Sequence, residues 1–296
     1  MNINKDRKGI LLCGGHATRL RPLTNIESLS KQILPIYNKP MVYYSMSILM
    51  EAGIKEILII STPEHIDFYK NIFGSGEYLG LKIDYLVQLD PAGIAQAYVL
   101  AEDFLNDSPS CLVLGDNLMY GEYLAQLLKE ANRDNLNHIF AKSVADPERF
   151  GVVEIDKNNI ALNIEEKPKN PKSNLAVPGI YFFDARAPEI AKKYKPSERG
   201  ELEITDVIGH YMKEKKLKVK VLKEGTLWLD CGTFDSLLNA SNLVKTVEKS
   251  NASIVACLEE IALNNNFISK NDIKLSPNYK LSNSYGEYLR KIINEA

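Results

Sequence analysis

The stretch that decides the fold runs from Leu11 to Pro40 and reads LLCGGHATRLRPLTNIESLSKQILPIYNKP. Its apolar beginning predicts a strand, and Gly14-Gly15 predict a tight turn directly after it. Hydroxyl and cationic side chains follow the turn, namely Thr18, Arg19, Arg21, Lys31 and Lys39. Glycines let backbone N–H groups approach a phosphate closely, and cations offset its charge. The stretch therefore predicts a site for a polyphosphate.

Other interpretations of this stretch are weaker. Gly14-Gly15-His16-Ala17 does not supply the dinucleotide-binding fingerprint G-x-G-x-x-G, and no G-K-[ST] triplet of a Walker loop follows it. The remaining alternative is an ordinary turn between a strand and a helix, with solvated cations. The series of cations and prolines at fixed distances disfavours that alternative.

Strand-like and helix-like runs alternate through the first half of the chain. The predicted strands are Gly9–Cys13, Glu56–Thr62, Lys82–Gln88 and Ser110–Asp116, and the predicted helices are Met41–Ala52, His65–Phe73, Gly93–Leu105 and Tyr123–Asn132. This rhythm predicts an α/β fold, with a mostly parallel mixed sheet covered by helices on both faces in a Rossmann-like α/β/α arrangement. Ligands of such sheets bind beyond the carboxyl ends of the strands.

After Asn137 the pattern changes to shorter strands, followed by a long helix. The strands are predicted at His138–Val144, Gly151–Ile155, Ile160–Lys167, Ala176–Asp184, Val219–Leu222 and Leu227–Asp230, and the helices at Ala187–Tyr194, Ile204–Lys215 and Thr233–Ser250. The tail keeps helical spacing of apolar residues at Leu258–Ala262 and Tyr285–Ile293. We therefore expect a core over residues 1–250 and a C-terminal helical annex over 251–296.

Composition limits the classes of partner. The chain has 296 residues with a formal net charge of −2, so no broad basic field exists for a nucleic acid or an anionic membrane. Cys13, Cys111, Cys231 and Cys257 form no C-x-x-C pair, and Cys13 and Cys111 lie in apolar runs typical of buried thiols. No membrane span or signal-peptide apolar region is recognisable, which predicts a cytoplasmic protein.

Two carboxylates stand at predicted strand ends. Asp116 follows the apolar run that begins at Cys111, and Asp230 ends Leu227–Asp230 before a glycine turn. Oxygen ligands beside a phosphate site suit Mg²⁺. For each residue the alternative is a helix cap, and the sequence alone does not reveal whether the two converge.

Further polar side chains lie at other strand ends. Lys167 could donate to a phosphate, and the preceding Glu166 could accept from sugar hydroxyls, although charged strand ends are usually solvated. Gln88 could recognise a base edge, because its amide offers both a donor and an acceptor. No histidine has a partner that suggests a triad or a metal cluster.

Together these segments resemble the signature of the sugar nucleotidyltransferases. The likeness covers nearly the whole chain, and it is greatest to the branch that transfers thymidylyl groups to glucose 1-phosphate. Its main strings are Gly14–Thr24, Lys31–Pro35 and Lys39-Pro40, supported by the segments 93–97, 114–117, 146–153, 165–168, 199–206, 228–233 and 257–262. The chain departs from the pattern at His16-Ala17, in a longer run before Lys31, and at Phe150, where a tyrosine is common.

The resemblance implies a Mg²⁺-dependent reaction. The phosphate oxygen of glucose 1-phosphate attacks the α-phosphorus of dTTP, which yields dTDP-glucose and pyrophosphate as the first step toward dTDP-rhamnose or related deoxysugars. Three cations are implied as catalytic, namely Arg19, Lys31 and Lys167. The implied nucleotide-binding residues are Leu11, Gly14, Gly15, Thr18, Arg19, Gln88, Gly93 and Asp116. Those implied for the sugar phosphate are Phe150, Gly151, Glu166, Lys167 and Val177, and the implied metal ligands are Asp116 and Asp230.

The same resemblance implies a homotetramer and a possible effector site for a downstream dTDP-sugar in the tail. Two alternatives stay open: the same chemistry with UTP or another sugar 1-phosphate, and a catalytically silent paralogue that binds nucleotide sugars. A glycosyltransferase with a D-x-D metal motif is disfavoured, because Asp116-Asn117-Leu118 stands where that motif would be expected.

Overall fold

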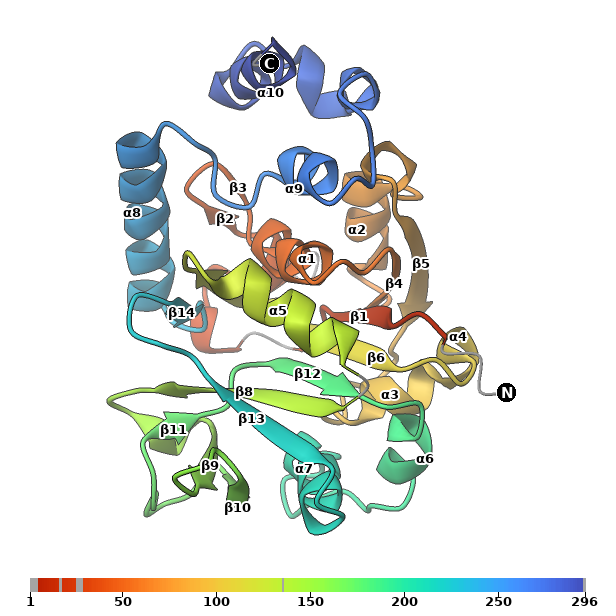
Figure 1. Ribbon diagram of the computed structural model, residues 1–296, viewed down its shortest axis with the longest axis vertical. Helices are drawn as coiled ribbons and strands as arrows, with labels where there is room; N and C mark the ends of the chain where they lie inside the picture. The colour runs from red at the N-terminus through yellow and green to blue at the C-terminus, as the bar shows by residue number, and fades with distance from the viewer. Residues whose placement is uncertain (1–4, 16–17, 25–28, 135, 295–296) are drawn as a thin grey trace.

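The computed structural model describes residues 5–15, 18–24, 29–134 and 136–294, so His16 and Ala17 lie outside the described residues. Figure 1 shows a central sheet with helices around it. In spatial order its strands are β10 (Ala161–Glu166), β9 (Gly151–Ile155), β11 (Leu175–Ala176), β8 (Asn137–Ser143), β12 (Ile180–Phe183), β6 (Ser110–Leu114), β1 (Lys8–Leu12), β4 (Glu56–Ser61) and β5 (Lys82–Val87), with β13 (Leu217–Val221) paired to β8.

The sheet has a parallel half and a largely antiparallel half. Parallel pairing joins β5, β4, β1 and β6, and it places Leu11 between Ile59 and Val113. From β12 outward the strands pair antiparallel, except that β13 runs parallel to β8. The predicted mixed sheet is thus confirmed. The carboxyl ends of β1, β4 and β6 meet at one edge, where ligands of such sheets bind.

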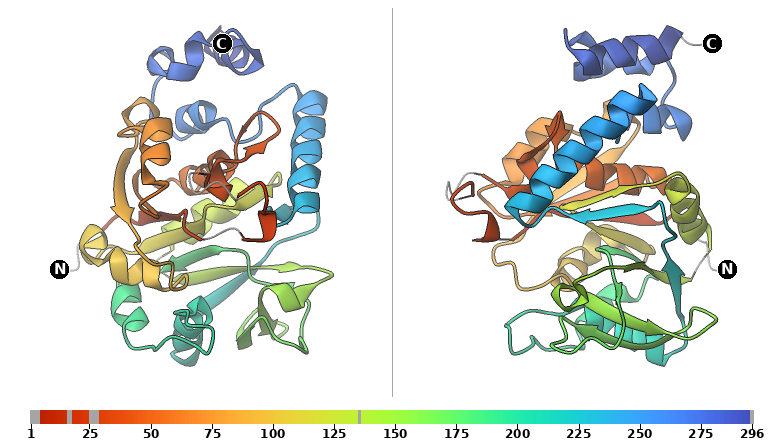
Figure 2. Two further views of the ribbon diagram at one scale, coloured as in Figure 1. Left: turned by 180° about the vertical axis from the view of Figure 1, so that it is seen from behind. Right: turned by 90° about the vertical axis from the view of Figure 1, so that its left-hand side faces the viewer.

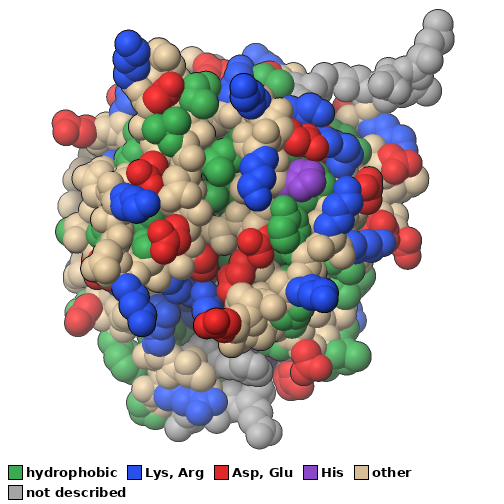
Figure 3. All heavy atoms as spheres, turned by 90° about the horizontal axis from the view of Figure 1, so that it is seen from below, with side chains coloured by type: hydrophobic (Ala, Val, Ile, Leu, Met, Phe, Trp, Pro, Cys, Tyr) green, Lys and Arg blue, Asp and Glu red, His purple; other side chains and the backbone are tan. Residues whose placement is uncertain are grey.

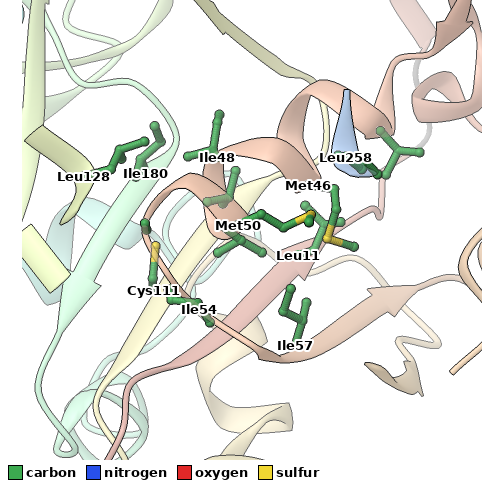
Figure 4. Packing of buried hydrophobic residues seen from close by; sticks show 14 of the residues in the cluster. Leu11, Met46, Ile48, Met50, Ile54, Ile57, Cys111, Leu128, Ile180 and Leu258 are labelled. Carbon is green, nitrogen blue, oxygen red and sulfur yellow. The ribbon is translucent and has the colours of Figure 1, made fainter. Parts of the chain in front are cut away.

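Helices cover both faces of the sheet. The helices on one face are α1 (Val42–Glu51), α2 (Ile66–Phe73) and α5 (Leu124–Arg133), and those on the other are α3 (Gln96–Leu100), α4 (Glu102–Leu105), α6 (Ala187–Ala191) and α7 (Ile204–Lys213). Successive strand residues point to opposite faces, so Leu11 joins the first cluster and Leu12 the second. Figure 4 shows Met46 and Met50 of α1 beside Leu11.

A short ribbon outside the main sheet consists of β7 (Asn117–Tyr120) and β14 (Leu227–Asp230), paired antiparallel. β14 leads into α8 (Phe234–Asn251), the long helix at the side of the molecule in Figures 1 and 2. The ribbon and the hairpin β2 (Pro35–Ile36)–β3 (Lys39–Pro40) pack against α8 through a separate apolar cluster.

The tail forms helices, as its apolar spacing predicted. α9 (Leu258–Asn264) returns to the core, where Leu258 joins the cluster under α1. The rest consists of two 3-10 turns, η5 (Asp272–Leu275) and η6 (Pro277–Lys280), and of α10 (Ser284–Asn294), and these pack around Ile273, Tyr285 and Leu289. Figure 1 shows this group beyond α9, at the end of the molecule that carries the C-terminus.

Two predicted elements are interrupted in the structure. The helix expected over Gly93–Leu105 begins at Gln96, because Gly93 has a φ of +102° and passes so close to Leu202 that a Cβ would lie 2.4 Å from its carbonyl oxygen. The strand expected over Ala176–Asp184 is split into β11 and β12. Pro178 lies in the gap and has no N–H to donate to a ladder.

The surface carries mixed charge. Figure 3 shows one face, on which basic and acidic side chains are interspersed and neither sign forms a continuous field. Among the described residues, no helix combines the length and apolarity needed to cross a bilayer. A charged ligand on this face must therefore be held by local groups.

Candidate active site

The first part of the site is the glycine turn after β1. Gly14 lies against Gln88, and a Cβ on Gly14 would meet the Gln88 side-chain oxygen at 2.6 Å. A side chain at position 14 would press on the Gln88 amide, so glycine suits this close approach. Gln88 follows β5 directly, so the ends of β1 and β5, with β4 between them, build one wall of the site.

The amide of Gln88 is held in one orientation. The Ala92 N–H donates to Oε1 of Gln96 at 3.0 Å, and Nε2 of Gln88 donates to the same oxygen at 2.6 Å. Among the described residues Oε1 of Gln88 has no hydrogen-bond partner, although Gln88 is only 2% exposed. A buried acceptor of this kind fits a ligand group that donates a hydrogen bond.

The β7–β14 ribbon brings the two carboxylates together. Asp230 lies opposite Asn117, the residue after Asp116. Neither carboxylate caps a helix: a strand follows Asp116, and the cap of α8 is Thr233, whose side-chain oxygen accepts from the Ser236 N–H at 3.2 Å. The cap alternative is therefore wrong for both residues.

Lys31 stands between these carboxylates. Its ammonium lies 2.5 Å from Oδ2 of Asp116 and 4.0 Å from Oδ1 of Asp230. Burial alone would lower the pKa of Lys31, but the two carboxylates outweigh burial and the pKa is raised. Burial and the neighbouring Asp116 carboxylate raise the pKa of Asp230, and this outweighs the positive charges of Lys31 and Arg149, which lower the pKa.

Arg149 is a site residue that sequence analysis missed. Its guanidinium donates to Oδ2 of Asp146 at 2.6 Å and to Oδ2 of Asp230 at 3.3 Å. It lies 5.1 Å from the ring centre of Phe150, which in turn packs against Trp228 at 4.9 Å. In the sequence, only its position beside Phe150 could have indicated a role in the site. Its ion-pair partner Asp230 is distant in the sequence and gave no indication.

The opposite wall contains the Glu166-Lys167 pair. Their side chains are 20% and 39% exposed, and Nζ of Lys167 lies 3.7 Å from Oε1 of Glu166. Arg199 approaches the same oxygen at 3.6 Å. Burial raises the pKa of Glu166. Gly151 and Val177 lie beside this pair, joined by a backbone hydrogen bond of 2.8 Å from the Val177 N–H.

Three adjoining cavities connect these groups, and Asp116 lines all three of them. The first is lined by the residues around Glu166, Phe150 and Asp230, the second by the glycine turn with Gln88 and Gly93, and the third by Thr18, Arg19 and Lys31. The lining residues that sequence analysis named are Gly14, Gly15, Thr18, Arg19, Lys31, Gln88, Gly93, Asp116, Phe150, Gly151, Glu166, Lys167, Val177 and Asp230.

Three residues singled out in the opening stretch, Leu11, Arg21 and Lys39, do not line these cavities. The Leu11 side chain is fully buried in the core, and its neighbour Leu12 lines the second cavity instead. Lys39 donates to Glu248 of α8 at 2.8 Å, and its side chain is buried there. Lys39 therefore joins the hairpin to α8 and does not belong to a phosphate cradle.

The described residues contain no group of three His, Cys, Asp or Glu side chains placed to hold a metal ion. Asp116 and Asp230 are the carboxylates that meet at the shared wall. Two carboxylates leave room for phosphate oxygens in the coordination sphere, as Mg²⁺ sites for nucleotides usually do.

Comparison with known proteins agrees with this geometry. The family model described as nucleotidyl transferase matches residues 8–247. Glucose-1-phosphate thymidylyltransferases of Neisseria gonorrhoeae and Xanthomonas campestris are 46% and 45% identical to the chain, covering 97% and 96% of it and 100% and 96% of their own lengths.

Solved structures share the fold. A Bacillus anthracis protein, described as a candidate glucose-1-phosphate thymidylyltransferase, superposes with a TM-score of 0.72 at 39% identity, over 80% of this chain and 94% of its own. A UDP-glucose pyrophosphorylase bound to UDP-glucose has a TM-score of 0.72 at 24% identity, over 82% of this chain and 100% of its own, which shows the fold alone. The chain belongs to the nucleotidyl transferase family, among the relatives of the glucose-1-phosphate thymidylyltransferases.

Proposed function

We propose that the protein transfers the thymidylyl group of dTTP to α-D-glucose 1-phosphate, releasing pyrophosphate and forming dTDP-glucose. One observation carries the proposal: Asp116, Asp230 and Lys31 converge where three cavities meet. A site of this kind can hold a nucleotide base, a triphosphate and a sugar phosphate around one reacting phosphorus.

The chemistry needs alignment and charge neutralisation more than a protein nucleophile. A phosphate oxygen of glucose 1-phosphate forms the new P–O bond at the α-phosphorus, and the bond to the leaving pyrophosphate breaks. Lys167 holds the sugar phosphate and Glu166 accepts from the sugar hydroxyls, with Phe150, Gly151 and Val177 beside them. Arg19 and Lys31 neutralise the charge of the triphosphate and of the leaving pyrophosphate. Gly14, Gly15 and Thr18 lie along the triphosphate.

Asp116 and Asp230 would hold Mg²⁺, with phosphate oxygens completing its shell. When bound, the ion neutralises charge that develops on the phosphate oxygens. The present residues fit this role, because two carboxylates already share one lysine ammonium at the place where the cavities join. Arg149, bound to Asp230, keeps that carboxylate directed toward the shared wall.

The base faces Gln88 and Gly93. Thymine and uracil differ by one methyl group, which an apolar slot distinguishes by only about 1–3 kcal/mol. Use of UTP, or of another sugar 1-phosphate, is therefore the second candidate.

We also propose roles for the whole protein. dTDP-glucose is a precursor of dTDP-rhamnose and related deoxysugars, and we assign the chain to the first step of that synthesis. The core would span 1–250, and the annex 251–296 would contribute to a homotetramer and to an effector site for a downstream dTDP-sugar. The small separate core of the tail supports its treatment as a unit.

A pyrophosphate-release assay with Mg²⁺, over a matrix of nucleoside triphosphates and sugar 1-phosphates, tests the reaction. The highest kcat/KM is expected for dTTP with glucose 1-phosphate. Preference for UTP would favour the second candidate. No turnover with any pair would overturn the enzymatic proposal in favour of a silent nucleotide-sugar-binding paralogue.

The same assay tests the carboxylates. Asp116→Asn and Asp230→Asn should each lower kcat at least ~100-fold, because each variant would hold Mg²⁺ less well and lose the stabilisation of the reacting phosphates, worth about 2.7 kcal/mol or more. Asp107→Asn is the matched control, since Asp107 is exposed and lies outside the three cavities. Near-normal rates for either site variant would remove that residue from the metal site.

A further inference from the structure

A buried tyrosine on α2 reaches the segment that carries Lys31. The Tyr69 side chain is fully buried, and its hydroxyl lies 2.7 Å from Oγ of Ser30 and 3.5 Å from Oε1 of Gln32. Oγ of Ser30 also donates to Oε1 of Gln32 at 2.6 Å. The hydroxyl thus contacts both neighbours of Lys31 in the sequence.

The same hydroxyl lies at the start of the glycine turn. It is close to the Cys13 thiol and the Ser61 hydroxyl, and Oγ of Ser61 donates to the Cys13 carbonyl at 3.0 Å. Nε2 of Gln32 approaches the Gly14 carbonyl at 3.4 Å. Tyr69 therefore joins the ends of β1 and β4 to the Lys31 segment through polar contacts.

The Lys31 segment is short, and it packs on the core through Ile33 and Leu34. It forms a single 3-10 turn, Lys31–Ile33, whose N-cap Ser30 makes no side-chain cap bond. Ser30 and Gln32 are 3% and 5% exposed, and both side chains are turned toward Tyr69. The Lys31 side chain points the other way and reaches Asp116. The contacts of Ser30 and Gln32 with Tyr69 therefore hold the backbone on both sides of Lys31.

We propose that Tyr69 is a positioning residue, whose hydroxyl fixes Ser30 and Gln32 and thereby sets the Lys31 ammonium between Asp116 and Asp230. This inference rests on the proposed nucleotidyl transfer. Tyr69 does not line the cavities and touches no substrate. Its effect on the reaction passes through Lys31.

Tyr69→Phe tests this role with little disturbance. The ring that packs in the core is kept, and Ser30 remains bound to Gln32. We expect kcat to fall by about 10-fold, because a small displacement of a charged group is costly in an aligned site. The KM for glucose 1-phosphate should stay within about twofold, since Lys167 binds that substrate.

Tyr211→Phe is the matched control. Tyr211 is equally buried and donates to Oδ1 of Asp184 at 2.8 Å, away from the three cavities. Its variant should keep the wild-type kcat. Both variants should show a similar shift in melting temperature, so a selective loss of kcat in Tyr69→Phe would not follow from stability.

A double-mutant cycle with Lys31→Met decides the route of the effect. In the Lys31→Met background, Tyr69→Phe should cause no further loss of kcat. Ser30→Ala should likewise add nothing to Tyr69→Phe. Wild-type kcat in Tyr69→Phe, or an undiminished loss in the Lys31→Met background, would overturn the inference. An inactive wild-type protein would instead overturn the proposed function.

Discussion

At the scale of single residues, the glutamine pair beside the glycine turn shows how one backbone group can orient a side chain in the site. The Ala92 N–H can only donate, so the Gln96 atom that faces it must be the oxygen. That oxygen then requires the nitrogen of Gln88. The oxygen of Gln88 is left facing the glycine turn, as an acceptor without a partner in the described part of the chain.

We predict that Gln96→Leu weakens the choice of base. Thymine carries a hydrogen on N3, which can donate to the fixed Gln88 oxygen, whereas cytosine has none there. With Gln88 free to turn its amide, the ratio of kcat/KM for dTTP to that for dCTP should fall about 10-fold, the effect of losing roughly 1.4 kcal/mol of discrimination.

Competition kinetics with the two nucleotides measure this ratio. Gln126→Leu provides the control, because Gln126 is exposed on α5, donates to Glu130 and lies outside the three cavities. An unchanged ratio in Gln96→Leu would mean that Gln88 needs no help from Gln96.

The polar residues at strand ends could be predicted from the sequence, but their proximity in the folded structure could not. Asp116 and Asp230 each stood out after an apolar run, yet only the β7–β14 ribbon brings them to one lysine. Arg149 was not predicted, because in a sequence an arginine whose carboxylate partner is distant cannot be distinguished from a solvent-exposed arginine. Lys39 had the right charge and spacing for the cradle, but its partner Glu248 lies on a distant helix.

At the scale of elements, apolar periodicity predicted the parallel half well. β1, β4, β5 and β6 lie within one or two residues of the predicted strands, since buried strands have continuous apolar runs. β7 was not predicted: it is four residues long and pairs with β14 far along the chain. Long-range pairing of this kind leaves almost no local signal in the sequence.

The end of α1 places a carboxylate in an unfavourable position. Glu51 is the last residue of α1, and burial raises its pKa to about 7, with only the Lys129 charge opposing the shift. The unfolded value lies near 4.5. Between these two values the folded protein binds more protons than the unfolded chain, so this group makes the protein less stable as pH rises.

Glu51→Gln should therefore stabilise the protein at pH 8 by about 1–2 kcal/mol, because the charged form no longer has to be buried. Near pH 4.5 the gain should largely vanish, since the carboxyl is protonated in the fold. Urea unfolding at both pH values measures the difference. Glu122→Gln, at an exposed position, should show no such pH dependence, and a gain equal at both pH values would contradict the burial argument.

At the scale of the whole molecule, the tail is joined to the core by α9 and held together by one buried carboxylate. Glu259 is fully buried. Its Oε1 accepts from Ser276 at 2.7 Å and from Asn278 at 2.9 Å, and its Oε2 accepts from Tyr285 at 2.7 Å. These donors come from η6, its cap and α10, so a single side chain connects most of the annex.

Glu259→Gln should loosen the annex by about 1–3 kcal/mol, because the amide nitrogen cannot accept and Tyr285 loses its acceptor at this position. Limited proteolysis should cut the tail faster. Fluorescence of Trp228, the single tryptophan, reports on the core and should change little in its unfolding midpoint. Glu287→Gln, at an exposed position on α10, is the control. Equal loss in both readouts would show that annex and core unfold as one unit.

The pairing of β7 with β14 has a consequence for synthesis on the ribosome. When α7 leaves the exit tunnel, Lys31 and Asp116 are already outside it, but Asp230 and the strand that presents it still follow behind. A nascent or prematurely terminated chain can thus complete the parallel half of the sheet without completing the reaction centre. The active site is therefore completed late in translation. Truncated products that end before β14 contain the nucleotide pocket but lack Asp230.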